Sequence, residues 1–418
     1  MATKLKRTLG VFETTLYGVG VILGAGIYAL IGKAAGLGGN AVWLSFLLCA
    51  ILAAFTGLSY AELSSIFPKA GGEYVYIEKA FNRRLAFLVG WLILVGGVIS
   101  AATVALGFGN YFNALFHTPI LPVACLLIFL LTLLNLWGIK ESSIANIVAT
   151  LIEAGGLIII IALGLRYMPT INYFELPPGG FTGVISATAL IFFAYLGFED
   201  IVRLSEEAKN PTKTIPKSLV LAIIISTILY VLTAAAAVAV VGWEKLAESQ
   251  APLALVAQTA FGAKAFFILS IIALFATFNT VLVILIATSR MLYGMAENHG
   301  LPKIFANVHK KFKTPWVAVL LVGLFSAIFL LIKKIEIVAS LTDFALLLTF
   351  ALVNASLLYL RYKSPNLKRP FKTYWPLAII GLVMSIYLLF HFEKMILLGG
   401  LLATLAGLGV YEIIKKKV

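Results

Sequence analysis

The sequence is poor in charge. Of its 418 residues only 12% are charged, whereas 61% are hydrophobic and the mean hydropathy is +1.03. Soluble domains carry about 25% charged residues and are roughly half apolar, so this composition excludes a soluble globular protein. Apolar runs long enough to cross a bilayer, which takes roughly 20 residues, recur along the chain. We therefore expect an all-α integral membrane protein.

Cysteine and histidine are also scarce. Cys49 and Cys125 both lie in apolar runs, so we expect no disulfide framework. The four histidines lie at the ends of apolar runs or between them, at His117, His299, His309 and His391. They form neither a metal-ligand pattern nor a catalytic triad. A membrane-embedded enzyme is therefore disfavoured, and we expect no metal or organic cofactor.

Polar stretches between the apolar runs are short, and none is long enough to fold as a separate domain. Runs bounded by charge, Gly and Pro clusters predict twelve membrane-crossing helices. They are 11–36, 41–67, 83–115, 120–138, 142–166, 181–204, 216–242, 264–297, 313–332, 336–361, 373–391 and 395–414. Of the 32 basic residues, 25 fall at the termini and the even-numbered connections. Because basic residues mark the cytoplasmic side, we expect both termini in the cytoplasm.

The net charge of +14 does not call for a nucleic-acid partner. Basic residues at the cytoplasmic ends of the helices would meet the anionic headgroups of membrane lipid. We therefore expect a multi-pass protein of the cell membrane, surrounded by lipid.

Glycine is concentrated in the first predicted helix. The stretch GVGVILGAGIY begins at Gly18 and has further glycines at positions 20, 24 and 26. Each glycine inside a helix costs about 1 kcal/mol relative to alanine, so the middle of this helix is weak. Small residues four apart, such as Gly20 and Gly24, allow two helices to pack closely. The alternative is a broken helix that lines a polar cavity.

A second interruption lies in the sixth predicted helix, where Gly197 is followed by Glu199 and Asp200. Two broken helices, five helices apart, are typical of transporters built from an inverted repeat, in which free backbone groups at both breaks bind the substrate. We predict a first five-helix repeat at 1–166 and an inverted second repeat at 181–361. Two additional helices would follow within 373–418.

Four stretches carry a family resemblance: GVILGAGIY, AELSSIFPKAGGEYVYIEKAF, FFAYLGFEDIVRLSEEAKNPTKTIPKSL and GMAENHGLPKIFANVHKKFKTPWVA. Together, and in the family's order, they resemble the amino acid, polyamine and organocation (APC) transporter superfamily, in particular its prokaryotic amino acid permeases. The resemblance implies a LeuT-like five-plus-five inverted repeat with discontinuous helices 1 and 6. It also implies secondary active transport of amino acids by alternating access.

The resemblance further implies where a substrate would bind. Backbone amides at the positive N-terminal end of the outer half of helix 1 would receive the substrate carboxylate, and carbonyls at the ends of the inner half-helices would receive its ammonium group. The implied amide positions are Gly24, Ala25, Gly26 and Ile27, and the implied carbonyls belong to Ile22, Phe193, Ala194 and Leu196. Phe193 matches an aromatic position that lies over bound substrate in relatives.

Two acidic residues follow the second break. Glu199 matches an acidic position at the end of the helix 6 break in the family, and an equal alternative is a charge that reaches into a water-filled channel. Asp200 departs from the small residue usual there. Both acids could hold a positively charged substrate side chain. Asn279 and Thr280 are further polar candidates for the pocket wall, with helix packing as the alternative.

Glu153 lies near the middle of the fifth predicted helix. Many relatives carry a lysine here, which stands in for a sodium ion beside helix 1, so this chain has the opposite charge. A glutamate can carry a proton or ligate a cation through its oxygens. Our hypothesis is that Glu153 is the coupling site, with a proton favoured over sodium. The alternative is a structural hydrogen bond to a neighbouring helix.

We therefore predict a proton-coupled carrier of small neutral amino acids. The alternatives within transport are an amino acid exchanger and a carrier of cationic amino acids or polyamines. A channel is disfavoured because the sequence contains neither a repeated selectivity-filter loop nor a ring of one charge.

Overall fold

The computed structural model describes residues 9–67, 72–137, 143–297 and 301–415, and most of these residues are helical. Its apolar runs form α1 (Val11–Leu23), α2 (Gly26–Gly38), α3 (Val42–Ile66), α5 (Arg83–Phe116), α6 (Ile120–Trp137), α7 (Ser143–Gly164), α8 (Gly180–Ile191), α9 (Asp200–Arg203), α10 (Pro211–Val241), α13 (Ala263–Glu297), α14 (Trp316–Phe329), α15 (Ile335–Lys363), α16 (Trp375–Leu389) and α17 (Lys394–Lys415). The predicted all-α class is confirmed.

Eight helical segments of the described chain are long and apolar enough to cross a membrane. Shorter apolar helices accompany them, among them Val11–Leu23 and Trp375–Leu389. Large apolar side chains such as Leu402 and Val383 lie exposed on the outer helices, where lipid would cover them. The chain is a multi-pass membrane protein, and the exact number of twelve crossings stays a prediction.

The structure contains three short helices that the sequence did not predict, and one helix begins earlier than predicted. α4 (Gly72–Ala80), α11 (Trp243–Glu248) and α12 (Pro252–Phe261) lie in connections where the sequence predicted none. α10 begins at Pro211 rather than near residue 216. Proline suits the first position of a helix because its missing N–H has no acceptor there, so Pro211 starts the helix and Pro216 lies inside it.

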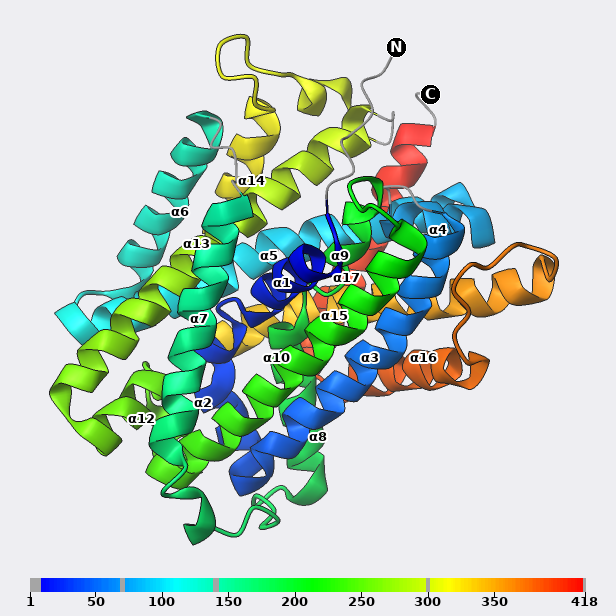
Figure 1. The fold of residues 1–418 in the computed structure, drawn as a ribbon. Helices are drawn as coiled ribbons and strands as arrows, with labels where there is room; N and C mark the ends of the chain where they lie inside the picture. The colour runs from blue at the N-terminus through cyan, green and yellow to red at the C-terminus, as the bar shows by residue number, and fades with distance from the viewer. Residues whose placement is uncertain (1–8, 68–71, 138–142, 298–300, 416–418) are drawn as a thin grey trace.

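The two broken helices lie at the centre of the bundle (Figure 1). α1 packs on α7 and α10, while α6 lies at one edge of the view and α16 at the opposite edge. α2 packs against α8, α3 against α10, and α5 against α13. Six tyrosines with no exposed surface lie in this core: Tyr28, Tyr60, Tyr76, Tyr111, Tyr195 and Tyr230.

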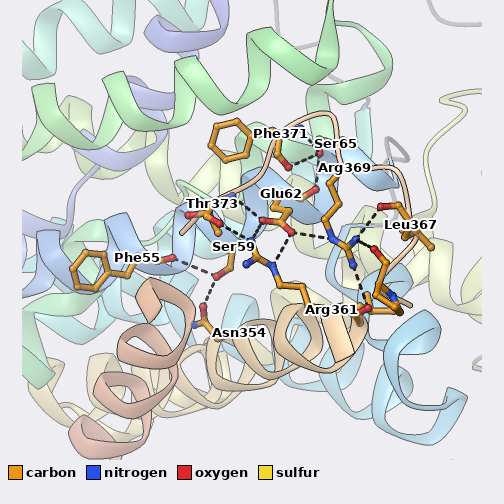
Figure 2. A network of polar contacts seen from close by, with 12 residues as sticks. Phe55, Ser59, Glu62, Ser65, Asn354, Arg361, Leu367, Arg369, Phe371 and Thr373 are labelled. Carbon is orange, nitrogen blue, oxygen red and sulfur yellow. Dashed lines mark hydrogen bonds and ion pairs between the residues drawn. The ribbon is translucent and has the colours of Figure 1, made fainter. Parts of the chain in front are cut away.

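A buried ionic cluster ties α3 to the end of α15 (Figure 2). Glu62 of α3 has no exposed surface, and one of its carboxylate oxygens accepts a hydrogen bond from Nε of Arg361 at 3.0 Å. The other oxygen accepts from Nη2 of Arg361 and from the backbone N–H of Thr373 at 2.8 Å. Arg369 lies 3.3 Å from the same carboxylate and donates to four carbonyls within residues 360–367. The cluster therefore fixes the loop between α15 and α16.

Removing the charge at the centre of this cluster should destabilise the fold. In Glu62→Gln two arginines lose their carboxylate, and breaking a buried pair in this way costs about 3–5 kcal/mol. We expect a clearly lower unfolding midpoint for the purified protein in detergent. The matched control is Glu412→Gln, because Glu412 pairs with Arg84 at 3.4 Å with both side chains about half exposed, and such pairs contribute less than about 1 kcal/mol. Equal midpoints for the two variants would contradict the assignment.

Candidate functional site

The first break separates α1 from α2 at Gly24 and Ala25. The Ala25 N–H donates to Oγ1 of Thr280 on α13 at 3.1 Å, and the Ala25 carbonyl accepts the first hydrogen bond of α2, from Ala29, at 2.9 Å. The amides of residues 26–28 precede that bond, so they have no acceptor within the helix. The break therefore presents backbone donors at the positive end of α2.

The glycines of this stretch serve both roles that the sequence suggested, at different positions. A Cβ added at Gly20 would overlap the side chain of Thr150 on α7, so Gly20 allows close helix packing. A Cβ added at Gly26 would lie 2.6 Å from Cα of Ala194, which belongs to the second break. Gly26 therefore allows the two breaks to touch, backbone against backbone.

The second break follows α8, which tightens into the 3-10 turn η3 (Phe192–Tyr195) before α9 begins at Asp200. Gly197 has φ +107°, a conformation that strongly favours glycine. Its N–H donates to Oε2 of Glu199 at 2.9 Å. The Glu199 carboxylate thus satisfies backbone that no longer belongs to a helix.

Tyr230 of α10 connects the two breaks. Its hydroxyl lies 2.5 Å from the carbonyl oxygen of Ile22 and 2.9 Å from that of Ala194. A phenol has one proton to donate, so it serves one carbonyl at a time while the other keeps accepting capacity. Tyr230 could not be recognised from the sequence, because a tyrosine in an apolar helix has no pattern that separates this role from packing.

The two breaks face a cavity of about 160 Å³. A cavity needs roughly 10–15 Å³ to hold one water, so this one has room for a small organic molecule. Of the site residues taken from the sequence, those in its wall are Ile22, Gly24, Ala25, Gly26, Phe193, Ala194, Leu196 and Glu199. Ile27 and Glu153 lie outside the wall, whereas Asp200, Asn279 and Thr280 are part of it.

The cavity extends toward one end of the bundle. Its wall takes residues from the N-terminal half of α5, such as Gly97, and from the C-terminal half of α13, such as Met291. On the other side of the break, Tyr28 and Tyr111 are fully buried, and the Tyr111 hydroxyl donates to the Tyr28 carbonyl at 3.1 Å. Packed aromatic side chains therefore close the opposite end.

Glu153 of α7 lies next to the first break and is 1% exposed. Its backbone carbonyl accepts from the Tyr28 hydroxyl at 2.7 Å, and its Oε1 lies 3.5 Å from Nδ2 of Asn279. The second contact is at the long limit of a hydrogen bond. Because Asn279 lines the cavity, a single side chain separates Glu153 from it. Among the described residues no group of three His, Cys, Asp or Glu side chains suited to a metal ion is found.

Comparison with known proteins decides the family. A family described as amino acid permease matches residues 9–393. The chain belongs to this permease family. The permease is 30% identical to the branched-chain amino acid permease BcaP of Bacillus subtilis, over 99% of its own length and 94% of the relative's. It is 32% identical to the methylthioribose transporter of B. subtilis, over 88% of its own length and 84% of the relative's.

Another relative of the permease is the vacuolar cationic amino acid transporter 4 of Arabidopsis thaliana, at 29% identity over 87% of the permease and 64% of the relative. The family and these relatives are transporters. The permease is therefore an amino acid transporter and not an enzyme.

The contact between the breaks yields a test of the site. Gly26→Ala places a methyl group against the Ala194 backbone, and overpacking of this kind costs about 1–3 kcal/mol. We expect amino acid binding to the purified permease to weaken by about 5-fold to 150-fold, since 1.4 kcal/mol is a factor of ten. Gly155→Ala is the matched control, because a Cβ at Gly155 meets nothing within 4 Å. If both variants bound amino acids like the unmutated protein, the site would lie elsewhere.

Proposed function

We propose that the permease is a secondary active transporter that carries small neutral amino acids across the cell membrane together with protons, by alternating access. The observation that carries the proposal is the cavity where two broken helices meet, with amides at the start of α2 on one side and carbonyls at the ends of the preceding helical segments on the other. This arrangement matches a zwitterion, which has a carboxylate at one end and an ammonium group at the other.

In the proposed mode of binding, substrate replaces two hydroxyl groups. The amides of residues 24–27 at the positive end of α2 receive the carboxylate, and the carbonyls of Ile22, Phe193, Ala194 and Leu196 receive the ammonium group. In this structure Thr280 accepts from the Ala25 amide, and Tyr230 donates to the Ile22 or Ala194 carbonyl. Since unsatisfied backbone is costly inside a membrane, these hydroxyls would hold the breaks until substrate arrives.

The pattern of helix contacts supports a LeuT-like inverted repeat at 1–166 and 181–361. α7 is helix 5 of the first repeat, and it packs on helix 1 (α1), helix 7 (α10) and helix 8 (α13). Its counterpart in the second repeat is helix 10 (α15), which packs on helix 6 (α8 and η3), helix 2 (α3) and helix 3 (α5). Likewise, α6 packs on α5 and on α13, as α14 does on α13 and on α5. Exchanging helices 1–5 for helices 6–10 thus reproduces these contacts, as a two-fold axis requires. With α16 and α17 added, this arrangement gives twelve crossings.

The cavity's direction fits one state of an alternating-access cycle. It extends toward the ends of α5 and α13 that adjoin the predicted cytoplasmic connections, where basic residues are concentrated. The opposite end is closed by Tyr28 and Tyr111. We infer an inward-facing state with both termini in the cytoplasm, and an outward-facing state reached by movement of the half-helices about the breaks.

Two observations bear on the substrate side chain. One oxygen of Glu199 accepts from the Gly197 amide, so this carboxylate has a role in holding the break. One relative, which matches over 99% of this chain, is named for branched-chain amino acids. We therefore favour neutral substrates, while Asp200 in the cavity wall and the cationic transporter relative keep cationic substrates as the second candidate.

Competition in counterflow separates these candidates. Proteoliposomes loaded with unlabelled alanine should take up labelled alanine from outside, and this uptake should be reduced by excess external leucine but not by excess arginine or putrescine. The reason is that one of the two acids in the cavity wall, Glu199, already accepts from the Gly197 amide, which leaves only Asp200 in that wall for a cation. Competition by arginine or putrescine as strong as that by leucine would establish the cationic alternative instead. Uptake into amino-acid-free vesicles distinguishes a symporter from an obligate exchanger.

Glu153→Gln tests the coupling site. Glutamine keeps the size and the contact with Asn279 but cannot carry a proton. One coupled proton supports about tenfold accumulation per unit of transmembrane pH difference, so we expect the variant to lose accumulation of that order while counterflow persists. Full proton-driven accumulation by the variant would remove Glu153 from the mechanism, and dependence on a sodium gradient in the unmutated protein would replace the proton by sodium.

A further inference from the structure

A second buried carboxyl group lies beside the second break. Asp343 of α15 has no exposed surface. The backbone N–H of Phe193 faces the carboxyl, yet within the described ranges neither carboxyl oxygen has a hydrogen bond of normal geometry. Leu346, one turn further along α15, lines the cavity together with Phe193. Asp343 therefore lies one residue away from the cavity, as Glu153 does on the other side.

The surroundings of Asp343 offer no compensating charge. Of the elements packed against α15, α3 contributes the Cys49 thiol, which donates to the Thr188 carbonyl at 3.3 Å, and η3 contributes the Tyr195 hydroxyl next to Cys49. Glu62 on α3 is held by its own arginines. In the described part of α5, α8 and α16, no ionised side chain reaches Asp343. A buried carboxylate without a partner is strongly disfavoured, so the group is neutral in this conformation.

Asp343 and Glu153 occupy equivalent positions in the two halves of the proposed inverted repeat. At 1.5 Å per residue, Glu153 lies about 15 Å along α7 from its start at Ser143, and Asp343 lies about 12 Å along α15 from its start at Ile335. The two helices cross in opposite directions, so both acids come close to the middle of a hydrocarbon core about 30 Å thick. α7 touches the first broken helix and α15 touches the second.

We propose that Asp343 is a second proton-binding site of the transport cycle, on the helix 6 break as Glu153 is on the helix 1 break. This inference rests on the proposed proton-coupled transport. When the cavity opens on the other side and water reaches Asp343, the carboxyl O–H bond breaks and the proton passes to water. The carboxylate then accepts a charge-assisted hydrogen bond from the Phe193 amide. Reprotonation reverses this step and releases the amide.

The position of Phe193, the residue proposed to lie over the substrate, would thereby depend on the charge of Asp343. A proton fits this site better than a metal cation. The group facing the carboxyl is an N–H donor, and among the described side chains no cluster of metal-binding acids includes Asp343. Protonation of Asp343 would therefore couple the opening of the cavity on its other side to the position of Phe193 in the binding site.

Infrared spectroscopy tests the charge state directly, without transport. A neutral buried carboxyl gives a carbonyl stretch apart from those of carboxylates and amides. At neutral pH we expect this signal in the purified unmutated protein. The part of the signal that comes from Asp343 should remain in Glu153→Gln and should be lost in Asp343→Asn. If the carboxylic-acid carbonyl stretch were as strong in Asp343→Asn as in the unmutated protein, Asp343 would not be its source, and the proposal would be overturned.

Transport tests the role in coupling. In proteoliposomes with a transmembrane pH difference, Asp343→Asn should lower alanine accumulation by about tenfold per pH unit for each coupled proton lost, with a far smaller effect on counterflow. Glu336→Gln, an acid in the first turn of the same helix, is the control and should accumulate normally. Asp343→Asn accumulating like the control would contradict the proposal.

Two further measurements keep the outcomes distinct. If Asp343→Asn does not fold, as judged by its thermal unfolding, Asp343→Ser provides a smaller neutral replacement with the same expected results. If the unmutated protein shows no amino acid counterflow, the proposed function fails, whereas the infrared signal still reports the protonation of Asp343. Asp343→Asn could lose coupling while its infrared signal stays intact. The neutral carboxyl would then belong to another acid, and the inference would be rejected.

Discussion

Inside a membrane every backbone N–H and C=O must find a partner within the protein, and the rest of this structure depends on how that constraint is met at two breaks. Side chains from neighbouring elements replace the missing helical bonds: Thr280 at Ala25, Tyr230 at the carbonyls of the two breaks, and Glu199 at Gly197. Each replacement is a single hydrogen bond. A ligand with both a carboxylate and an ammonium group could take over several of them at once.

The surrounding structure separates fixed from adjustable parts. The ionic cluster around Glu62 fixes the loop after α15 with charges that have several partners each. By contrast, the breaks are held by the hydroxyl groups of Thr280 and Tyr230 and by the Glu199 carboxylate. Among the buried acids, Glu153 and Asp343 have at most one long side-chain contact in the described chain. Groups with few partners change partners at low cost, which is what a carrier requires at its binding site.

The long apolar helices and both breaks could be predicted from the sequence, because apolar run length and glycine spacing are local signals. α4, α11 and α12 were missed because short helices in connections lack a long apolar run. Tyr230 could not be identified, since its role depends on two carbonyls distant in sequence. Asp343 was within reach: the criterion that singled out Glu153, an acid inside an apolar run, applies to it equally. What placed it beside Phe193 was tertiary packing.

The central claim is that backbone groups of the two breaks bind the two ends of an amino acid. The most direct test is an experimental structure of the permease with bound alanine or leucine. We expect the carboxylate at the amides of residues 24–27 and the ammonium group at the carbonyls of Ile22 and Ala194, with the bonds to Thr280 and Tyr230 broken. Substrate bound elsewhere, with both of those hydroxyl contacts still in place, would contradict it.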